Sequence, residues 1–312
     1  MSLALLFPGQ GSQHVGMGRS LAHEHPVAAQ TFEEADDVLG FSISHLAWEG
    51  PEQDLVLTKN AQPAMLTHSI AVHRVIVERV ADTAMAAGHS LGEFSAHVAA
   101  GTLGFADAVR TVRLRGELMY AAGQDRPGTM AAVLGLSDED VVSVCQQART
   151  EGGTCVPANF NSQGQVVISG DIEGIERAME LASELGAKRV VKLSVSGAFH
   201  SPLMAPAEDG LRAHLENTAF EDPAHPVVAN VTAQPVTTAE AARQLLIRQL
   251  TSPVRWAESV GQMVESGVDA FLELGPGSVL RGLNRRNAKG IPCSSLGEPE
   301  DFETWEDIEN AI

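Results

Sequence analysis

The sequence is poor in aromatic and basic side chains, and each shortage argues against a class of protein. It has a single Tyr beside 29 Gly, so it lacks the aromatic platform on which proteins stack single-stranded nucleic acid. Its 312 residues include 21 Lys and Arg against 40 Asp and Glu, a formal charge of −19. That charge disfavours nonspecific binding to nucleic acid or an anionic membrane, although a local basic patch could still bind an acidic partner.

Long apolar segments and paired cysteines are also missing. No stretch approaches the roughly 18 apolar residues that cross a bilayer, and the first residues lack the basic and apolar regions of a signal peptide. Cys145, Cys155 and Cys293 lie far apart without CxxC spacing. We interpret them as buried free thiols in a reducing compartment, which predicts a cytoplasmic protein.

The chain has the composition of an ordinary globular protein. It is 44% hydrophobic and 20% charged, and its length suggests about two domains or one domain with an insertion. Apolar runs at 3–7 and 84–88 each end in a glycine-containing turn, and the second leads into an Ala-rich helix over 92–100. Helical spacing covers 27–40 and 62–80, with Pro63 in the first turn of the second helix. Strand, sharp turn and helix indicate an α/β fold.

The pattern changes near residue 128 and predicts an inserted subdomain. Strands are expected at 130–136, 155–160, 165–169 and 188–195, and helices open at Ser137 and Asp171. This βαββαβ order is the ferredoxin-like arrangement. We therefore predict a large α/β domain of residues 1–127 and 196–312, with further strands at 226–230 and 270–274, and a small subdomain of residues 128–195.

The strongest local motif is Gly88-His89-Ser90-Leu91-Gly92, which fits G-x-S-x-G between a predicted strand and a predicted helix. Glycines allow a tight turn that lifts Ser90 out of the chain at a helix N-terminus, where backbone N–H groups face a developing oxyanion. The motif favours a nucleophilic Ser90 over a purely structural turn.

A serine nucleophile needs a base, and His200 is the best candidate among 11 histidines. It follows the last strand of the insertion, at the junction of the two subdomains, where clefts form. His14 stays ambiguous, His89 should point away from a tight turn, and His97 lies two helical turns beyond Ser90. The other histidines are interpreted as surface or packing residues.

Arg115 lies in a predicted helix among apolar residues, unlike a solvated arginine. A partly buried arginine beside a cleft can bind a carboxylate through its two-pronged guanidinium group. Spacing alone leaves both a binding role and a surface role open.

Taken together, these motifs resemble those of the malonyl-CoA:acyl carrier protein transacylase family over nearly the whole chain. The matching segments, in order, are residues 7–13 (FPGQGSQ), 88–93 (GHSLGE), 115–116 (RG), 159–162 (NFNS) with 165–170 (QVVISG), 199–204 (FHSPLM), 249–250 (QL) with 253–256 (PVRW), and 273–277 (ELGPG). The resemblance implies an α/β-hydrolase-like core with an inserted ferredoxin-like subdomain.

The same resemblance implies a role for each matching residue. Ser90 corresponds to the acylated nucleophile and His200 to its base, with no carboxylate in the triad. A backbone carbonyl, expected to be that of Gln249, orients the histidine. The backbone N–H groups of Gln10 and Leu91 correspond to the oxyanion hole. Arg115 pairs with the malonyl carboxylate, and Phe199 beside His200 implies a preference for malonyl over methylmalonyl.

The implied reaction is ping-pong transfer of malonyl from malonyl-CoA to the phosphopantetheine thiol of acyl carrier protein, without cofactor or metal. We expect a monomer whose docking surface includes Lys188, Arg189 and Lys192, with Arg281, Arg285, Arg286 and Lys289. Differences from the family are Tyr120 where many relatives carry Gln, Gln163 before Gly164, and an acidic segment from Asn287. An esterase or thioesterase, a polyketide acyltransferase and an inactive carrier-protein binding module stay open as alternatives.

Overall fold

The computed structural model describes residues 2–149, 153–302 and 305, and within them two β-sheets organise the chain. The larger sheet has the order β10-β9-β1-β2-β7-β8. Its strands are β10 (Cys293–Leu296), β9 (Ala270–Leu274), β1 (Leu3–Phe7), β2 (Met85–Gly88), β7 (Val227–Val228) and β8 (Pro235–Val236). All neighbouring pairs are parallel except β7 and β8.

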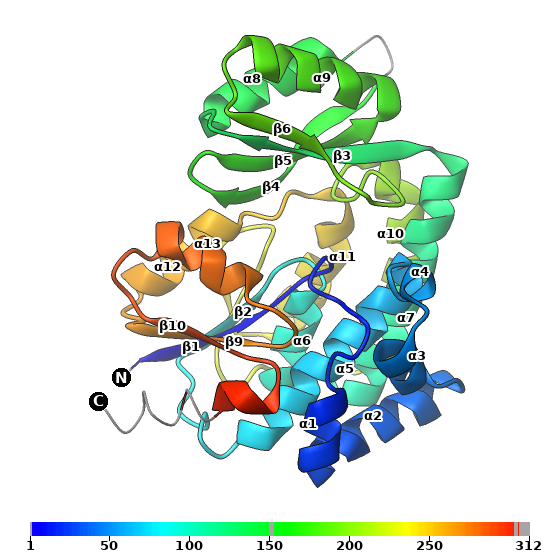
Figure 1. The fold of residues 1–312 in the computed structure, drawn as a ribbon, viewed down its shortest axis with the longest axis vertical. Helices are drawn as coiled ribbons and strands as arrows, with labels where there is room; N and C mark the ends of the chain where they lie inside the picture. Colours follow the sequence, from blue (N-terminus) through cyan, green and yellow to red (C-terminus); the bar gives the residue numbers. More distant parts are fainter. Residues whose placement is uncertain (1, 150–152, 303–304, 306–312) are drawn as a thin grey trace.

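Helices cover both faces of the larger sheet, which is why its central strands β1 and β2 are continuous apolar runs rather than alternating ones. Along β1, Leu5 and Phe7 pack into one core cluster with the helices α5 (Thr58–Ile76), α6 (Gly92–Ala99) and α7 (Phe105–Asp125). Ala4 and Leu6 point to the opposite face and pack against α12 (Trp256–Glu265) and α13 (Val279–Asn287). Figure 1 shows α12 and α13 on one side of this sheet and α5 to α7 on the other.

The remaining helices of the large body flank these layers. They are α1 (Arg19–Glu24), α2 (Pro26–Leu39), α3 (Ile43–Glu49), α4 (Glu52–Leu55), α10 (Ala205–Leu215) and α11 (Ala239–Arg248), with the short 3₁₀ helices η1 (Pro202–Met204) and η2 (Gln249–Thr251).

The smaller sheet is antiparallel throughout, with the order β4-β5-β3-β6. Its strands are β4 (Cys155–Ser162), β5 (Gln165–Asp171), β3 (Gly128–Leu134) and β6 (Arg189–Lys192). The helices α8 (Asp138–Ala148) and α9 (Ile172–Glu184) pack on one face around Ala131 and Val133, while Met130 on the other face joins the core of the large body. In Figure 1 this sheet with its two helices forms the upper part of the molecule.

The observed elements agree with the predicted order and differ at some boundaries. The helix expected to start at Gln62 begins at Thr58, and Pro63 lies inside it. Proline lacks the N–H that would bond to the carbonyl four residues earlier, and Arg113 Nη1 donates to the Lys59 carbonyl at 3.1 Å instead. The strand expected over 188–195 is shorter, with β6 ending at Lys192. The division at residues 127/128 and 195/196 stays a prediction.

The long helix α5 carries Lys59 and Arg74 near its two ends, and α7 carries charged side chains along its length. Within the described residues, no helix is long and apolar enough to cross a bilayer. The acidic segment predicted from Asn287 is described only as far as residue 302 and at residue 305, so the rest of it lies outside the described residues.

Candidate active site

The turn between β2 and α6 presents Ser90 in a left-handed backbone conformation, with φ of 52°. The flanking glycines are sterically required, because a Cβ at Gly88 would overlap Gly92 and a Cβ at Gly92 would overlap the Phe7 carbonyl. Asn230, which follows β7, braces the turn: its Oδ1 accepts from Ser90 N at 2.7 Å and its Nδ2 donates to Gly88 O at 2.6 Å. The glycine spacing of the motif thus fixes an outward-facing hydroxyl.

His200 lies against this hydroxyl, although 110 residues separate it from Ser90 in the chain. Its Nε2 is 2.8 Å from Ser90 Oγ, and its Nδ1 lies 3.0 Å from the Gln249 carbonyl and 3.2 Å from the Ser252 carbonyl. Two carbonyl acceptors place the ring proton on Nδ1 and leave the Nε2 lone pair facing Ser90. Burial, and then the nearby charge of Arg115, lower the pKa of His200 to about 3, so the ring is neutral.

Arg115, on α7, completes the constellation and is only 1% exposed. Its Nη2 donates to Gln249 Oε1 at 2.9 Å and lies 3.2 Å from Ser90 Oγ, and its Nη1 donates to Gln62 Oε1 at 2.7 Å. Burial lowers its pKa to about 10, so it is still a cation at neutral pH. Within the described residues its guanidinium forms no ion pair, and an anion beside Ser90 would therefore meet an unneutralised positive charge.

Gln10 reaches the same place from the loop after β1. Its Oε1 accepts from Thr58 Oγ1 at 2.9 Å, and Thr58 Oγ1 accepts from Gln62 Nε2 at 2.8 Å, so a relay of side chains joins this loop to Arg115. In the described part of the chain, the backbone N–H groups of Gln10 and Leu91 donate to no protein acceptor. Both donors are free for an oxyanion.

Gln249, at the start of η2, connects Ser90 and His200 to a buried carboxylate. Its carbonyl holds His200, while its Nε2 donates to Ser90 O at 2.9 Å and to Glu93 Oε2 at 2.6 Å. Glu93 is fully buried on α6, and burial raises its pKa to about 7. Phe199 is also buried, at 7% exposure, next to His200.

The other candidate histidines lie apart from the hydroxyl. His89 Nε2 pairs with Asn161 Oδ1 at 2.8 Å, and the His89 ring stacks at a tilt on Trp256, which turns it away from Ser90. His97 is buried with neither ring nitrogen hydrogen-bonded among the described residues, and His14 Nδ1 lies 3.4 Å from the Ser12 carbonyl.

The structure brings together Ser90, His200, Arg115, Gln10 and Gln249, as the sequence reasoning expected. That reasoning missed residues that hydrogen-bond to them, which include Thr58, Gln62, Glu93, Asn230 and Ser252. A polar residue at the end of an apolar strand was available as a signal for Asn230. For Thr58, which precedes the predicted helix, and for Gln62, at its predicted start, the sequence offers no comparable signal.

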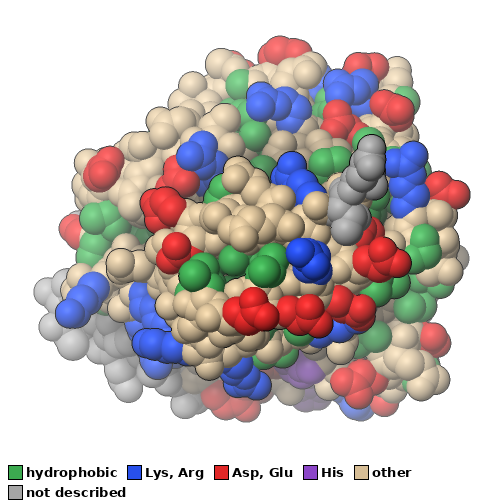
Figure 2. Space-filling model, turned by 90° about the horizontal axis from the view of Figure 1, so that it is seen from above, with side chains coloured by type: hydrophobic (Ala, Val, Ile, Leu, Met, Phe, Trp, Pro, Cys, Tyr) green, Lys and Arg blue, Asp and Glu red, His purple; other side chains and the backbone are tan. Residues whose placement is uncertain are grey.

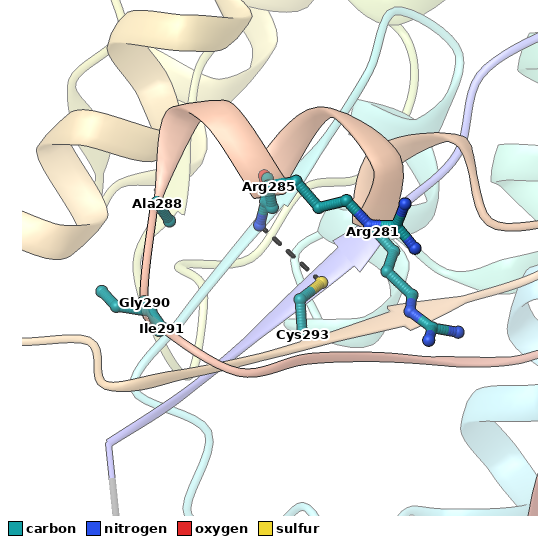
Figure 3. A pocket seen from close by; sticks show the side chains of 7 residues that line it. Arg281, Arg285, Ala288, Gly290, Ile291 and Cys293 are labelled. Atoms are coloured by element: carbon teal, nitrogen blue, oxygen red, sulfur yellow. Dashed lines mark hydrogen bonds between the residues drawn. The ribbon is translucent and has the colours of Figure 1, made fainter.

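Two hollows lie away from Ser90 and His200, both beside α13, and basic residues line both. Figure 3 shows Arg281 and Arg285 extending from α13 over the first hollow, with Cys293 beneath them. Lys188, Arg189 and Arg286 line the second, beside the turn between β4 and β5. Among the described residues, no group of three or more His, Cys, Asp or Glu side chains could hold a metal ion.

Comparisons with known proteins agree with this geometry. Residues 4–298 match the family model described as the acyl transferase domain. The chain is 46% identical to the malonyl CoA-acyl carrier protein transacylase of Bacillus subtilis, covering 96% of this chain and 95% of that protein. It is 45% identical to the protein of the same name from Escherichia coli K12, covering 95% and 96%.

Solved structures give the same result at the level of the fold. A malonyl-transacylase in complex with a type II polyketide synthase acyl carrier protein superposes with a TM-score of 0.94 at 44% identity, covering 97% of this chain and 98% of that one. The acyl-carrier-protein-S-malonyltransferase of Bartonella henselae superposes with a TM-score of 0.94 at 42% identity, covering 99% of each chain. The predicted α/β-hydrolase-like fold with a ferredoxin-like subdomain is confirmed.

Proposed function

Because the chain belongs to the acyl transferase family, we propose that it transfers a malonyl group from malonyl-CoA to the phosphopantetheine thiol of acyl carrier protein and so supplies fatty acid synthesis. The observation that carries the proposal is the position of Arg115, whose Nη2 lies 3.2 Å from the Ser90 hydroxyl that pairs with His200. An acyl group on Ser90 with a terminal carboxylate would meet this cation.

In the first half-reaction, Ser90 Oγ attacks the thioester carbon of malonyl-CoA while His200 Nε2 takes the hydroxyl proton. The thioester oxygen becomes an oxyanion, which accepts from the N–H groups of Gln10 and Leu91. The carbon–sulfur bond then breaks, His200 returns its proton to the departing CoA thiolate, and malonyl stays on Ser90 as an ester.

In the second half-reaction, the carrier thiol enters and His200 removes its proton. The sulfur attacks the ester carbon through the same oxyanion site, and the carbon–oxygen bond to Ser90 breaks. The proton on His200 returns to Ser90 Oγ, which restores the free enzyme and leaves malonyl on the carrier. The carbonyls of Gln249 and Ser252 hold the ring throughout and stabilise its charged form.

The proposal is tested by intact-mass spectrometry after mixing the protein with malonyl-CoA. We expect one malonyl adduct, mapped to Ser90 by peptide analysis, that disappears when carrier protein is added. Ser90→Ala should form no adduct while unfolding at a similar temperature, and His200→Ala should acylate roughly 10²–10⁴ times more slowly. A malonyl adduct on Ser90→Ala would exclude Ser90 as the nucleophile.

A second candidate is the same transfer in polyketide synthesis, because one structural relative was solved with a type II polyketide synthase carrier protein. The two functions are separated by comparing kcat/KM for the acyl carrier protein of fatty acid synthesis with kcat/KM for that of polyketide synthesis. A hydrolase is less well supported, since carbonyls rather than a carboxylate hold His200 Nδ1.

We also propose that the protein acts as a cytoplasmic monomer. Its three cysteines are free thiols, as expected for a reducing compartment. Light scattering across a concentration series tests the monomer, and cell fractionation tests the compartment.

A further inference from the structure

Glu93 is a fully buried carboxylate that touches none of the reacting atoms but contacts two residues that hold them. It lies on α6, three residues after Ser90. Its Oε2 accepts from Gln249 Nε2 at 2.6 Å and from Asn230 N at 3.2 Å. Gln249 supplies a carbonyl to His200, and Asn230 braces the Ser90 turn. Burying a carboxylate costs free energy unless hydrogen bonds compensate for the lost water, so these two contacts indicate the role of Glu93.

The contact with Gln249 fixes which way its carboxamide faces. In the observed orientation Oε1 accepts from Arg115 Nη2 at 2.9 Å, and Nε2 donates to Glu93 and to the Ser90 carbonyl. The reversed amide would aim its NH₂ at the guanidinium and its oxygen at the carboxylate, which sets donor against donor and acceptor against acceptor. A carboxylate can only accept, so it permits one orientation.

Charge supports the same arrangement. The elements packed around α6 include α5, α7, α11, β1, β2 and β7. The charged group among them that lowers the pKa of Glu93 is Arg115 of α7. The negative charge of Glu93 in turn raises the pKa of Arg115. The Gln249 carboxamide lies between the two groups and is hydrogen-bonded to both. The carboxylate, the amide and the guanidinium therefore form one polarised series that ends at Ser90 Oγ.

We propose that Glu93 is a positioning residue: by locking the Gln249 carboxamide with its oxygen toward Arg115, it aims the guanidinium at the terminal carboxylate of the acyl group. The inference rests on the proposed malonyl transfer and deepens it, because it concerns selection of a carboxylated acyl group. Glu93 acts on the substrate only through Gln249 and Arg115.

The main test is Glu93→Gln, which keeps the size of the side chain but can turn either oxygen or NH₂ toward Gln249. The Gln249 amide then loses the charged one of the three contacts that fix its orientation, and the contacts with Arg115 and the Ser90 carbonyl remain. We expect kcat/KM for acylation by malonyl-CoA to fall about tenfold, the effect of losing one hydrogen bond to a charged group, and that for acetyl-CoA to change less than about twofold. Equal losses for both thioesters, or a stronger malonyl preference, would overturn the proposal.

A double-mutant cycle tests whether the effect passes through Gln249. Gln249→Met removes the side-chain amide and keeps the backbone carbonyl that holds His200. In that background Glu93→Gln should no longer change the ratio of malonyl to acetyl rates, because the coupled element is already gone. An undiminished effect would show that Glu93 does not act through Gln249, and the proposal would fail.

Glu273→Gln is the matched control, since Glu273 is equally buried but accepts from the N–H groups of Leu280 and Arg281 at the start of α13. It should lower the unfolding temperature and leave the malonyl-to-acetyl ratio unchanged. If Glu93→Gln does not fold, Glu93→Asp supplies the same readout, because its shorter side chain cannot reach Gln249 and should show the same malonyl-selective loss.

The pH profile gives a signature that a merely structural residue would lack. Burial raises the pKa of Glu93 to about 7, so lowering the pH through neutrality should protonate the carboxylate and reduce the malonyl-to-acetyl ratio of the wild-type enzyme. Glu93→Gln should show a flat ratio. The wild-type malonyl adduct on Ser90 is measured in the same series. Its absence contradicts the proposed function, whereas its presence together with an unchanged malonyl-to-acetyl ratio in Glu93→Gln contradicts only the positioning role.

Discussion

At the residue scale, the two side chains that we propose react share an unusual backbone conformation. Ser90 and His200 have φ angles of 52° and 57°, a region that costs a non-glycine residue roughly 1–2 kcal/mol. The Asn230 side chain holds the first, and the carbonyls of Gln249 and Ser252 hold the ring of the second. The surrounding hydrogen bonds thus hold a strained pair with Ser90 Oγ 2.8 Å from His200 Nε2.

Arg115 gives the sharpest prediction at this scale. Arg115→Ala should lower kcat/KM for malonyl-CoA by about 10²-fold or more, because a desolvated charge pair with the substrate carboxylate is lost. Acetyl-CoA has no carboxylate and should be affected far less. Single-turnover acylation with both thioesters measures the ratio, and equal losses would contradict the ion pair.

Phe199 should control substitution at the α-carbon of the acyl group. Phe199→Ser removes a large buried ring beside His200, so we expect the preference for malonyl-CoA over methylmalonyl-CoA to narrow severalfold. Competition between the two thioesters in one reaction, followed by mass spectrometry of the acyl-enzyme, measures the preference. An unchanged ratio would show that the ring does not contact the α-carbon.

Residues of the site differed in how far sequence could reveal them. Ser90 was predictable because a glycine-flanked serine between strand and helix is typical of a nucleophile at a sharp turn. His200 and Arg115 needed the resemblance, since one histidine in a loop and one arginine in a helix each fit several roles. The role of Glu93 could not be predicted, because it depends on a contact with Gln249, 156 residues away.

At the element scale, the caps of the two helices on the smaller sheet give a matched pair of predictions. Asp171 accepts from Gly174 N at 2.7 Å at the start of α9 and also from Thr154 N. Among the described residues, Ser137 accepts only from Asp140 N, at 3.1 Å, at the start of α8. Asp171→Ala should therefore destabilise the protein by about 2 kcal/mol and Ser137→Ala by about 1 kcal/mol.

Urea unfolding followed by circular dichroism measures both variants. A larger loss for Ser137→Ala than for Asp171→Ala would contradict the contribution of the Thr154 contact. Both caps were predictable from sequence, because Ser and Asp before an apolar-spaced segment are typical N-caps. The start of α5 was not predictable, since Pro63 normally marks a first turn and here lies one turn further in.

At the scale of the whole molecule, the charge of −19 must be reconciled with an acidic carrier protein. Figure 2 shows blue basic side chains interspersed with red acidic ones at the end of the molecule that carries the smaller sheet. Lys188, Arg189, Arg285 and Arg286 are exposed, and within the described residues they form no ion pair, unlike Lys192, which pairs with Glu176 at 3.1 Å.

Charge reversal tests these residues as a docking surface. The double variants Arg285→Glu with Arg286→Glu, and Lys188→Glu with Arg189→Glu, should raise KM for carrier protein about tenfold or more and leave the rate of acyl-enzyme formation from a small uncharged thioester unchanged. Added salt should weaken transfer to carrier protein more than that acylation.

Arg19→Glu with Arg110→Glu, on α1 and α7, is a control of equal charge change. Its KM for carrier protein should stay within about twofold of the wild-type value. If the control weakens transfer as much as the two test variants, net charge rather than a local surface governs docking.

Buried histidines predict a molecule that loses stability in mild acid. Burial lowers the pKa of His68 and His73 to about 4 and of His97 and His200 to about 3, so the unfolded chain binds protons first as the pH falls below 6.5. The stability that these neutral histidines contribute is complete above pH 6.5. It is lost as the pH falls toward their pKa values in the folded protein. Glu93 and Glu273, whose pKa values burial raises, oppose this trend.

The four histidines outweigh the two carboxyl groups, and we expect the free energy of unfolding to fall on the order of 2 kcal/mol per pH unit between pH 6.5 and 5. Urea unfolding at several pH values measures the slope. His97→Leu loses no hydrogen bond among the described residues and should flatten the slope by up to about 1.4 kcal/mol per pH unit. An identical slope would contradict burial of a neutral His97.

The backbone of β4 is hydrogen-bonded directly to the chain that follows η2. Val254 N donates to Ala158 O at 2.8 Å, and Phe160 N donates to Val254 O at 2.9 Å, only two residues beyond the Ser252 carbonyl that holds His200. The smaller sheet and the histidine support are therefore parts of one cooperative unit. We expect the amides of Val254 and Phe160 to exchange slowly with solvent. On heating, the smaller sheet should melt and acylation should be lost in a single transition.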